Sequence, residues 1–385
     1  MRVSIYMKQY FKILPHYLFD LIFARVLMPD IRKREIKTIL LSGYTGLGHF
    51  ILKSVLVQKL QELFPESKIS IIAGNSYGTE FVLNDYPTFI LKQERNWLNK
   101  IFFFLQLRQK KIDLILLPID ASPKFLIRGA ILAGIPRRVG HVFETDDFPD
   151  YYYTSKVLVG PGKKRSELDM NYDLIDAITP SKIKRSYRPF VSMNFNGSVL
   201  EKNKLEKDKY ICIQMGASNG NPTTKRWLKS HFRKLILMLI EKHPELSIVP
   251  LGDKGDEQIV NQICDGIYAA QLKNVAGKTT IEETKSLIAS CKMLICHDSG
   301  LLHLGNALGR NVIALYGPSN PDFYALNMPT CHILQKTCDC IPLLGLFPGK
   351  FGEPTEEEAA KKCPVPKCME RLKPEEVYSK CVELL

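Results

Sequence analysis

Short apolar runs alternate with amphipathic stretches along most of the chain. Each run has four to six residues, and a turn and a segment with helical spacing of apolar residues usually follow it. Continuous apolar runs of this length are typical of strands buried on both faces of a parallel sheet. The predicted strands are 38–42, 68–73, 113–117, 210–214, 246–251, 293–296 and 312–316, and the predicted helices are 49–64, 127–133, 229–242, 280–289 and 301–308. The pattern therefore predicts an α/β fold with parallel sheets.

The alternation weakens between residues 179 and 209, where Pro180, Pro189 and Gly197 fall among many lysines. Proline and glycine interrupt regular structure, so this stretch indicates a boundary. The 385 residues also exceed one common core and fit two domains. We predict two doubly wound, Rossmann-like domains at 37–190 and 210–385, facing each other across a cleft and joined by a linker at 191–209.

The first 36 residues form a basic segment with apolar residues at helical spacing. Lys8, Lys12, Asp20 and Arg25 interrupt the run of about 20 apolar residues that a spanning helix needs. No cleavage site of small residues follows, so the segment does not resemble a signal peptide. Two interpretations remain open: an amphipathic helix lying on a membrane surface, and a helix packed on its own protein.

Charge narrows the range of partners. The formal net charge is +13 and the pI is near 9.1, which favours phosphates, nucleic acid or an acidic membrane. Basic stretches at 108–111, 163–165 and 182–188 fit an anionic acceptor or a membrane surface, although each alone is typical of a solvated face. They show no interleaved platform of aromatic residues, so nucleic acid is not the expected partner.

Six of the ten cysteines lie in the last part of the chain. Cys338, Cys340, Cys363 and Cys368 could bind zinc as four thiolates, but their spacing is not the usual pair of C-x-x-C motifs. Packing or a conditional disulfide is the alternative. The other four cysteines lie in apolar or helical contexts that indicate reduced core residues of a cytosolic protein: Cys212, Cys264, Cys291 and Cys296.

Candidate site residues follow the ends of two predicted strands in the second domain. His297-Asp298-Ser299-Gly300 follows strand 293–296, and His303 lies one turn into the next helix. Asp298 and Ser299 also occupy a helix N-cap position, so capping is their structural alternative. After strand 210–214, the small residues of 215–219 and then Lys225 suit phosphate oxygens, with a solvated loop as the alternative. Both loops lie at the edge where ligands of parallel sheets bind.

Two further segments carry candidate side chains. Asp256 and Glu257 follow strand 246–251, where a carboxylate can bind ribose hydroxyls or remain a solvated turn acid. In the first domain, the glycine-rich turn 43–48 is followed by His49 at the start of a helix. A histidine there can act as a general base or as a polar cap.

Four segments in a fixed order carry a family resemblance: Lys225-Arg226-Trp227, 275–280, Asp298-Ser299-Gly300-x-x-His303 and Gly317-Pro318-Ser319. With them the chain resembles glycosyltransferase family 9, the ADP-heptose:lipopolysaccharide heptosyltransferases. The similarity runs from Lys37 to the C-terminus, with a poor match at 140–209.

The resemblance implies the GT-B architecture, with an acceptor domain at 37–190 and a donor domain at 210–385. It implies inverting transfer of a sugar, with heptose expected, from an ADP-sugar to an anionic glycolipid acceptor of the lipopolysaccharide type. No metal or cofactor is expected. Location in the cytoplasm, at the inner membrane, with contact through the N-terminal segment, follows as an expectation. The implied donor-binding residues are Ser218, Asn219, Lys225, Asp256, Glu257, Thr279, Asp298, Ser299, Gly300 and His303.

One departure from the family pattern concerns the catalytic base. The family turn reads Gly-x-Gly-Asp, whereas this chain has Gly46-Leu47-Gly48-His49. We predict that His49 replaces the aspartate as base and that Lys225 and Asp298 complete the catalytic set. Two alternatives remain: a nucleotide-sugar-binding protein without catalysis, and a GT-B nucleotide-sugar epimerase that acts on the donor alone.

Overall fold

The computed structural model describes most of the chain beyond the N-terminal segment, of which residues 1–34 lie outside the described part. The described residues are 35–44, 46–75, 82, 85–92, 95–119, 124–144, 146, 150–160, 166–179, 184–185, 188–192, 195, 197–216, 225–325, 328–338, 354–363 and 367–385. They divide into two compact units. One comprises the residues up to Gly46, Leu56–Lys163 and Met170–Arg185, and the other comprises Leu47–Val55, Lys164–Asp169 and Ser186–Leu385.

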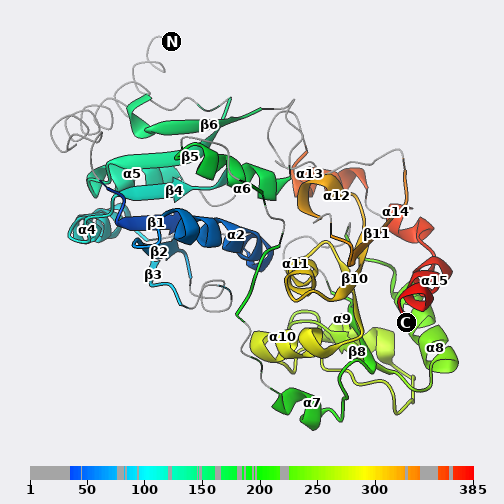
Figure 1. Ribbon diagram of the computed structural model, residues 1–385. Helices are drawn as coiled ribbons and strands as arrows, with labels where there is room; N and C mark the ends of the chain where they lie inside the picture. Colours follow the sequence, from blue (N-terminus) through cyan, green and yellow to red (C-terminus); the bar gives the residue numbers. More distant parts are fainter. Residues whose placement is uncertain are drawn as a thin grey trace. The chain divides into compact units, whose positions relative to one another are not determined.

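The first sheet has six strands, and every neighbouring pair is parallel. Their order is β3-β2-β1-β4-β5-β6, so the chain builds outward from β1 in one direction and from β4 in the other (Figure 1). The strands are β1 (Thr38–Ser42), β2 (Lys68–Ala73), β3 (Thr88–Ile90), β4 (Leu114–Leu117), β5 (Arg137–Phe143) and β6 (Ser155–Val159). This is the doubly wound order of dinucleotide-binding folds, and its switch point lies between β1 and β4.

Two helices cover one face of this sheet. Phe104 and Leu107 of α4 (Trp97–Arg108) and the apolar side of α5 (Lys124–Leu132) share a buried cluster with Leu40, Ile72 and Ile115. The remaining described helices of this half of the chain are α2 (Leu47–Leu63), the 3-10 turn η2 (Asp150–Tyr152) and α6 (Glu167–Asp176).

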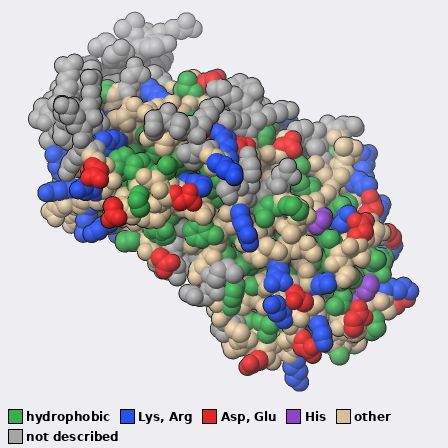
Figure 2. Space-filling model, in the orientation of Figure 1, with side chains coloured by type: hydrophobic (Ala, Val, Ile, Leu, Met, Phe, Trp, Pro, Cys, Tyr) green, Lys and Arg blue, Asp and Glu red, His purple; other side chains and the backbone are tan. Residues whose placement is uncertain are grey.

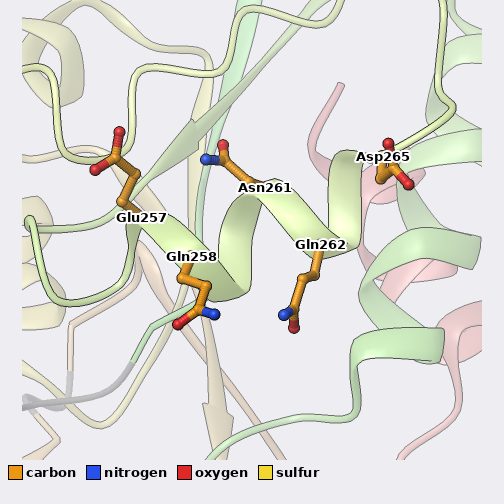
Figure 3. A pocket seen from close by; sticks show the side chains of 5 residues that line it. All are labelled: Glu257, Gln258, Asn261, Gln262 and Asp265. Atoms are coloured by element: carbon orange, nitrogen blue, oxygen red, sulfur yellow. The ribbon is translucent and has the colours of Figure 1, made fainter.

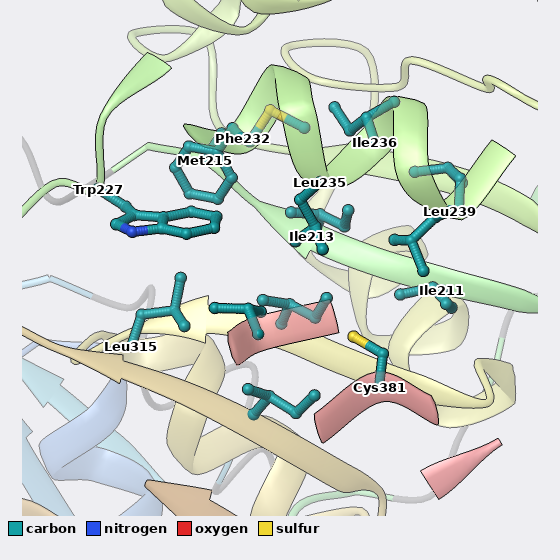
Figure 4. Close-up of a cluster of buried hydrophobic side chains, with 14 of the residues drawn as sticks. Ile211, Ile213, Met215, Trp227, Phe232, Leu235, Ile236, Leu239, Leu315 and Cys381 are labelled. Atoms are coloured by element: carbon teal, nitrogen blue, oxygen red, sulfur yellow. The ribbon is translucent and has the colours of Figure 1, made fainter. Parts of the chain in front are cut away.

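The second sheet has five parallel strands in the order β11-β10-β9-β7-β8. They are β7 (Tyr210–Gln214), β8 (Ser247–Leu251), β9 (Met293–His297), β10 (Asn311–Tyr316) and β11 (Cys331–Gln335). The helices are α7 (Ser198–Lys202), α8 (Lys229–Lys242), α9 (Glu257–Cys264), α10 (Ile281–Ser290), α11 (Gly300–Ala307), α12 (Pro321–Tyr324), α13 (Glu356–Lys362), α14 (Lys367–Arg371) and α15 (Pro374–Leu384). Apolar side chains of α8 and of the C-terminal helices fill the core on one face of the sheet (Figure 4).

The predicted elements are confirmed, and all seven predicted strands are present. Four strands were not predicted: β3, β5, β6 and β11. Strand β5 carries the fully buried Arg138, which interrupts its apolar pattern, and the guanidinium donates to four backbone carbonyls, among them those of Ile135 and Tyr152. The stretch predicted as a linker contains the short helix α7. Within the described residues, none of the helices has the length and hydrophobicity needed to span a bilayer.

Candidate functional site

The switch point of the second sheet lies between β7 and β9. From β7 the chain continues to β8 on one side, while β9 lies on the other side of β7, so the loops that leave β7 and β9 diverge. Ligands of open parallel sheets bind in the crevice that such diverging loops leave at the carboxyl ends of the strands. Gln214 ends β7, and Asp298, Ser299 and Gly300 follow β9 at this edge.

Lys225 and Asp298 form an ion pair at this edge. The Nζ of Lys225 donates to Oδ2 of Asp298 at 3.1 Å, and the two side chains are 25% and 9% exposed. Burial alone would raise the pKa of Asp298, but the ammonium of Lys225 lowers it, so the carboxylate stays ionised. The pair fixes a partly exposed ammonium group where the chain leaves β9.

Helix α11 begins at Gly300 without a side-chain cap. Ser299 occupies the N-cap position, but its hydroxyl donates to Oε1 of Gln214 at 2.6 Å instead of bonding the first turn of the helix. The capping interpretation of Ser299 is therefore wrong in its hydrogen bond, although its position is that of a cap. A helix N-terminus that no side chain caps can bind an anion through its N–H groups.

His303 lies in α11, three residues after its first residue. Its side chain is 5% exposed, and among the described residues no group hydrogen-bonds its buried Nδ1. Burial lowers the pKa of His303 to about 4, so the ring is neutral at pH 7. Because a buried polar atom costs free energy until it is paired, Nδ1 is a ready partner for a bound ligand.

His49 and Glu167 form a second polar pair, contributed by the first turns of α2 and α6. The distance between His49 Nδ1 and Glu167 Oε2 is 2.6 Å, and the side chains are 38% and 2% exposed. Burial alone would raise the pKa of Glu167, but His49, with help from Lys53, holds it at about 2. The ionised Glu167 therefore accepts the Nδ1 proton, and the other ring nitrogen of His49 can take up a proton.

Comparisons with known proteins show which family the chain is similar to. Residues 187–343 match the family model described as glycosyltransferase family 9 (heptosyltransferase). The resemblance to glycosyltransferase family 9 is confirmed. The match contains Lys225, Asp298, Ser299, Gly300 and His303.

Two curated relatives have heptosyltransferase names. Lipopolysaccharide heptosyltransferase 2 of Escherichia coli K12 is 34% identical over 128 residues, which cover 30% of this chain and 36% of that protein. Lipooligosaccharide heptosyltransferase 2 of Campylobacter jejuni serotype O:2 is 24% identical over 356 residues, which cover 89% of this chain and 96% of that protein. The chain spans about a third of the length of the first curated relatives that it matches.

A solved structure shows the shared fold. The structure of E. coli ADP-heptose LPS heptosyltransferase II has a TM-score of 0.65, with 21% identity, over 90% of this chain and 98% of that chain. With the two parallel sheets, this similarity confirms the α/β fold that the pattern of apolar runs predicts.

His297 has a structural role at the candidate site. Its Nε2 accepts from the backbone N–H of Trp227 at 2.9 Å, and its Nδ1 lies 3.0 Å from the carbonyl oxygen of Gly216, to which it donates. Burial lowers the pKa of His297 to about 4, in keeping with a neutral ring. Both ring nitrogens of His297 are therefore used to hold the loop that carries Lys225.

The family 9 resemblance assigns Asp256 or Glu257 to ribose. Asp256 is buried, and its carboxylate pairs with Arg226 at 3.5 Å. It also lies against Gly216: a Cβ there would be 1.9 Å from Asp256 Cγ, so only glycine fits. Burial raises the pKa of Asp256. These contacts give Asp256 a role in holding the loops after β7 and β8 together, and ribose binding stays a prediction.

Glu257 lies at the edge of a shallow pocket along α9 (Figure 3). The other side chains that line this pocket are Gln258, Asn261, Gln262 and Asp265, and neither Lys225 nor Asp298 is among them. Thr279, assigned to the adenine, contacts the hydroxyl of Thr284 at 3.0 Å. Ser218 and Asn219 lie outside the described residues.

Three of the four cysteines that were considered as zinc ligands lie within the described residues. Cys363 and Cys368 are buried, Cys338 is partly buried, and Cys368 and Cys338 belong to the core of the second sheet. Cys340 lies outside the described residues. Among the residues that are described, no group of three or more His, Cys, Asp or Glu side chains could hold a metal ion.

Two contributors to these sites were not predicted: Gln214 and Glu167. Gln214 is the last residue of a predicted strand, so its position at the edge could have been noticed. Glu167 lies 118 residues from His49, and no local pattern joins the two.

Proposed function

We propose that this chain transfers heptose from ADP-heptose to a lipopolysaccharide-type glycolipid, with inversion and without a metal ion. The observation that carries the proposal is the uncapped start of α11 beside the Lys225–Asp298 ion pair. These groups offer positive charge at the switch point of the second sheet, where a nucleotide diphosphate would bind. The similar protein from E. coli has ADP-heptose in its name, which supports this choice of donor.

The leaving diphosphate gains negative charge as its bond to the sugar breaks. Lys225 and the first-turn N–H groups of α11 would offset that charge, because both are fixed before the reaction begins. Asp298 orients Lys225 through the 3.1 Å contact. His303 would pair its buried Nδ1 with the donor, and this would remove the cost of leaving that nitrogen unpaired.

The acceptor hydroxyl needs a base. His49 would take the proton on Nε2, the hydroxyl oxygen would bond to the anomeric carbon, and the bond to the diphosphate would break on the opposite face of the sugar. Glu167 would stabilise the imidazolium that forms, as the carboxylate of a catalytic triad does. We expect the reaction to take place in the cytoplasm, at the face of the inner membrane that carries the acceptor.

Replacing His49 with Ala tests the proposed base separately from the proposed binding of the donor. Transfer from ADP-heptose should fall by about 10²–10⁴-fold because a general base is lost. The affinity for ADP, measured by calorimetry, should remain that of the parent, since the donor groups are intact. His332→Ala, on β11, is the matched control and should change neither quantity.

Three results would contradict the proposal in different ways. Full turnover in His49→Ala would remove His49 as the base. Binding of ADP by the parent protein without transfer would favour the non-catalytic interpretation. Conversion of the donor without any acceptor would favour the epimerase.

A further inference from the structure

Helix α4 has apolar side chains on both of its faces. On one face, Phe104 and Leu107 are buried in the core of the first sheet. Phe104 packs directly on α5: a Cβ added at Gly129 would lie 2.2 Å from the Phe104 ring. Ile101 and Phe103 are partly buried and pack against the same core, so these four side chains anchor the helix.

The other face is exposed. Trp97, Leu98, Phe102 and Leu105 are 68%, 46%, 62% and 41% exposed. At about 100° per residue these four positions fall within about 140° of the helix surface, an arc that also holds the partly buried Ile101. We call the four exposed side chains the α4 strip. Single exposed apolar residues are ordinary, but a contiguous strip with a tryptophan and a phenylalanine marks a contact surface.

Positive charge flanks the α4 strip. Between Lys92 and Lys111 the sequence has six Lys or Arg residues and one Glu. Lys92, Arg95, Lys110 and Lys111 are exposed. Figure 2 shows several Lys and Arg side chains, with a few Asp and Glu among them, in the region of the first sheet that carries α4.

We propose that the α4 strip docks on the surface of an anionic phospholipid bilayer. Trp97, Leu98, Phe102 and Leu105 would enter the boundary between headgroups and acyl chains, and the flanking lysines would contact lipid phosphates. Tryptophan favours that boundary because its ring is apolar and its N–H is polar. A second copy of the chain is a poorer occupant, since a symmetric contact would bring the same positive charges together. The docking element is distinct from the N-terminal segment.

The two tryptophans of the chain allow a direct test on the unaltered full-length protein. Trp227 is only 3% exposed, so a change in fluorescence on adding vesicles reports Trp97. With vesicles of equal parts phosphatidylcholine and phosphatidylglycerol, the emission should shift to the blue and be quenched by acyl-brominated lipids. Phosphatidylcholine alone should give neither change, and added salt should weaken the effect. Binding to anionic vesicles without quenching of Trp97 would overturn the proposal, as would the absence of binding.

Substitution provides the second measurement. Phe102→Glu with Leu105→Glu should reduce the fraction that sediments with anionic vesicles, with affinity lower by about tenfold or more. The matched control is Leu237→Glu, an equally exposed leucine on α8 (45%), which should bind like the parent. Unchanged binding in the α4 variant, or an equal loss in the control, would overturn the proposal. A parent dimer that the α4 variant converts to monomer, without an effect on vesicles, would assign the strip to a second copy instead.

Discussion

The loops that follow β1 and β9 show how one topology serves two kinds of chemistry. Both strands lie at the switch point of a parallel sheet. After β1, Tyr44 packs edge-on against Phe125 with ring centroids 5.7 Å apart, its hydroxyl donates to the carbonyl of Leu91, and burial raises its pKa. After β9 come Asp298, which pairs with Lys225, then the hydroxyl of Ser299 and the buried His303.

The two loops occupy equivalent places in their sheets, so their different chemistry comes from their side chains and not from the order of the strands. The edge of the second sheet concentrates groups that attract negative charge: Lys225 and the start of α11. In the first half of the chain, the turn after β1 is held by an aromatic contact, and the polar group that follows it is His49, which Glu167 prepares to take up a proton. One arrangement suits an anionic leaving group, and the other suits an acceptor hydroxyl.

Lys225→Met should have the largest effect on this contrast. It removes the ammonium that is proposed to face the diphosphate, so transfer should fall by about 10²–10³-fold and ADP should bind more weakly. The matched control is Lys229→Met, whose ammonium contacts Gln262 on the surface. Calorimetry with ADP and an assay of transfer would measure both effects. If Lys225→Met bound ADP as tightly as the parent, the carboxyl edge of the second sheet would not be the donor site.

His297→Leu should have the next largest effect, and on stability. It leaves the N–H of Trp227 and the carbonyl of Gly216 without their partner, which should lower the free energy of unfolding by about 2–4 kcal/mol. Urea unfolding followed by Trp227 fluorescence would measure it. His243→Leu, at a half-buried site, should cost less. If His297→Leu unfolded like the parent but lost ADP binding, the histidine would contact the ligand after all.

Glu167→Gln should have the smallest effect. It keeps the shape of the contact with His49 but removes the charge, so transfer should fall by about tenfold to hundredfold, with ADP affinity unchanged. Glu201→Gln, on the surface helix α7, is the control. A kcat equal to that of the parent over the whole pH range would leave Glu167 with a structural role only.

The pH dependence of stability gives an independent check on Glu167. Its pKa is about 2 in the folded chain against an ordinary value of 4.5. A depressed pKa contributes stability that is fully present above pH 4.5 and is lost as the pH falls toward 2. The difference in unfolding free energy between the parent and Glu167→Gln should therefore shrink as the pH falls below 4.5. A difference that grew in acid would contradict the ionised state of Glu167.

Local patterns in the sequence were sufficient for much of the fold. Strands β1, β7 and β9 are continuous apolar runs, and the motif from Asp298 to His303 follows β9 directly, so its place at the sheet edge could be predicted. Strand β5 could not, because its buried Arg138 satisfies its guanidinium with backbone carbonyls that only the folded chain brings near. A pattern of apolar residues does not indicate that a buried arginine will find backbone carbonyls to bond.

Contacts between side chains that are far apart in the chain also could not be predicted from the sequence. The contact of His49 with Glu167 depends on how two helix starts meet, and the bond of Ser299 with Gln214 depends on the neighbouring positions of β7 and β9. Residue type and position alone made capping the structural alternative for Ser299. The fold supplied a competing acceptor, and the hydroxyl bonds to it.

The hydrogen bond of the Ser299 hydroxyl with Gln214 sets the proposed binding of the donor against the stability of α11. A serine that capped α11 would stabilise the helix by about 1 kcal/mol and would occupy one of the first-turn N–H groups that the proposed diphosphate would use. By engaging Ser299, Gln214 keeps the helix less stable and open to ligand. Selection for thermostability alone would therefore be expected to replace Gln214 with a residue that releases Ser299, and the resulting protein would be sturdier and a poorer binder of its donor.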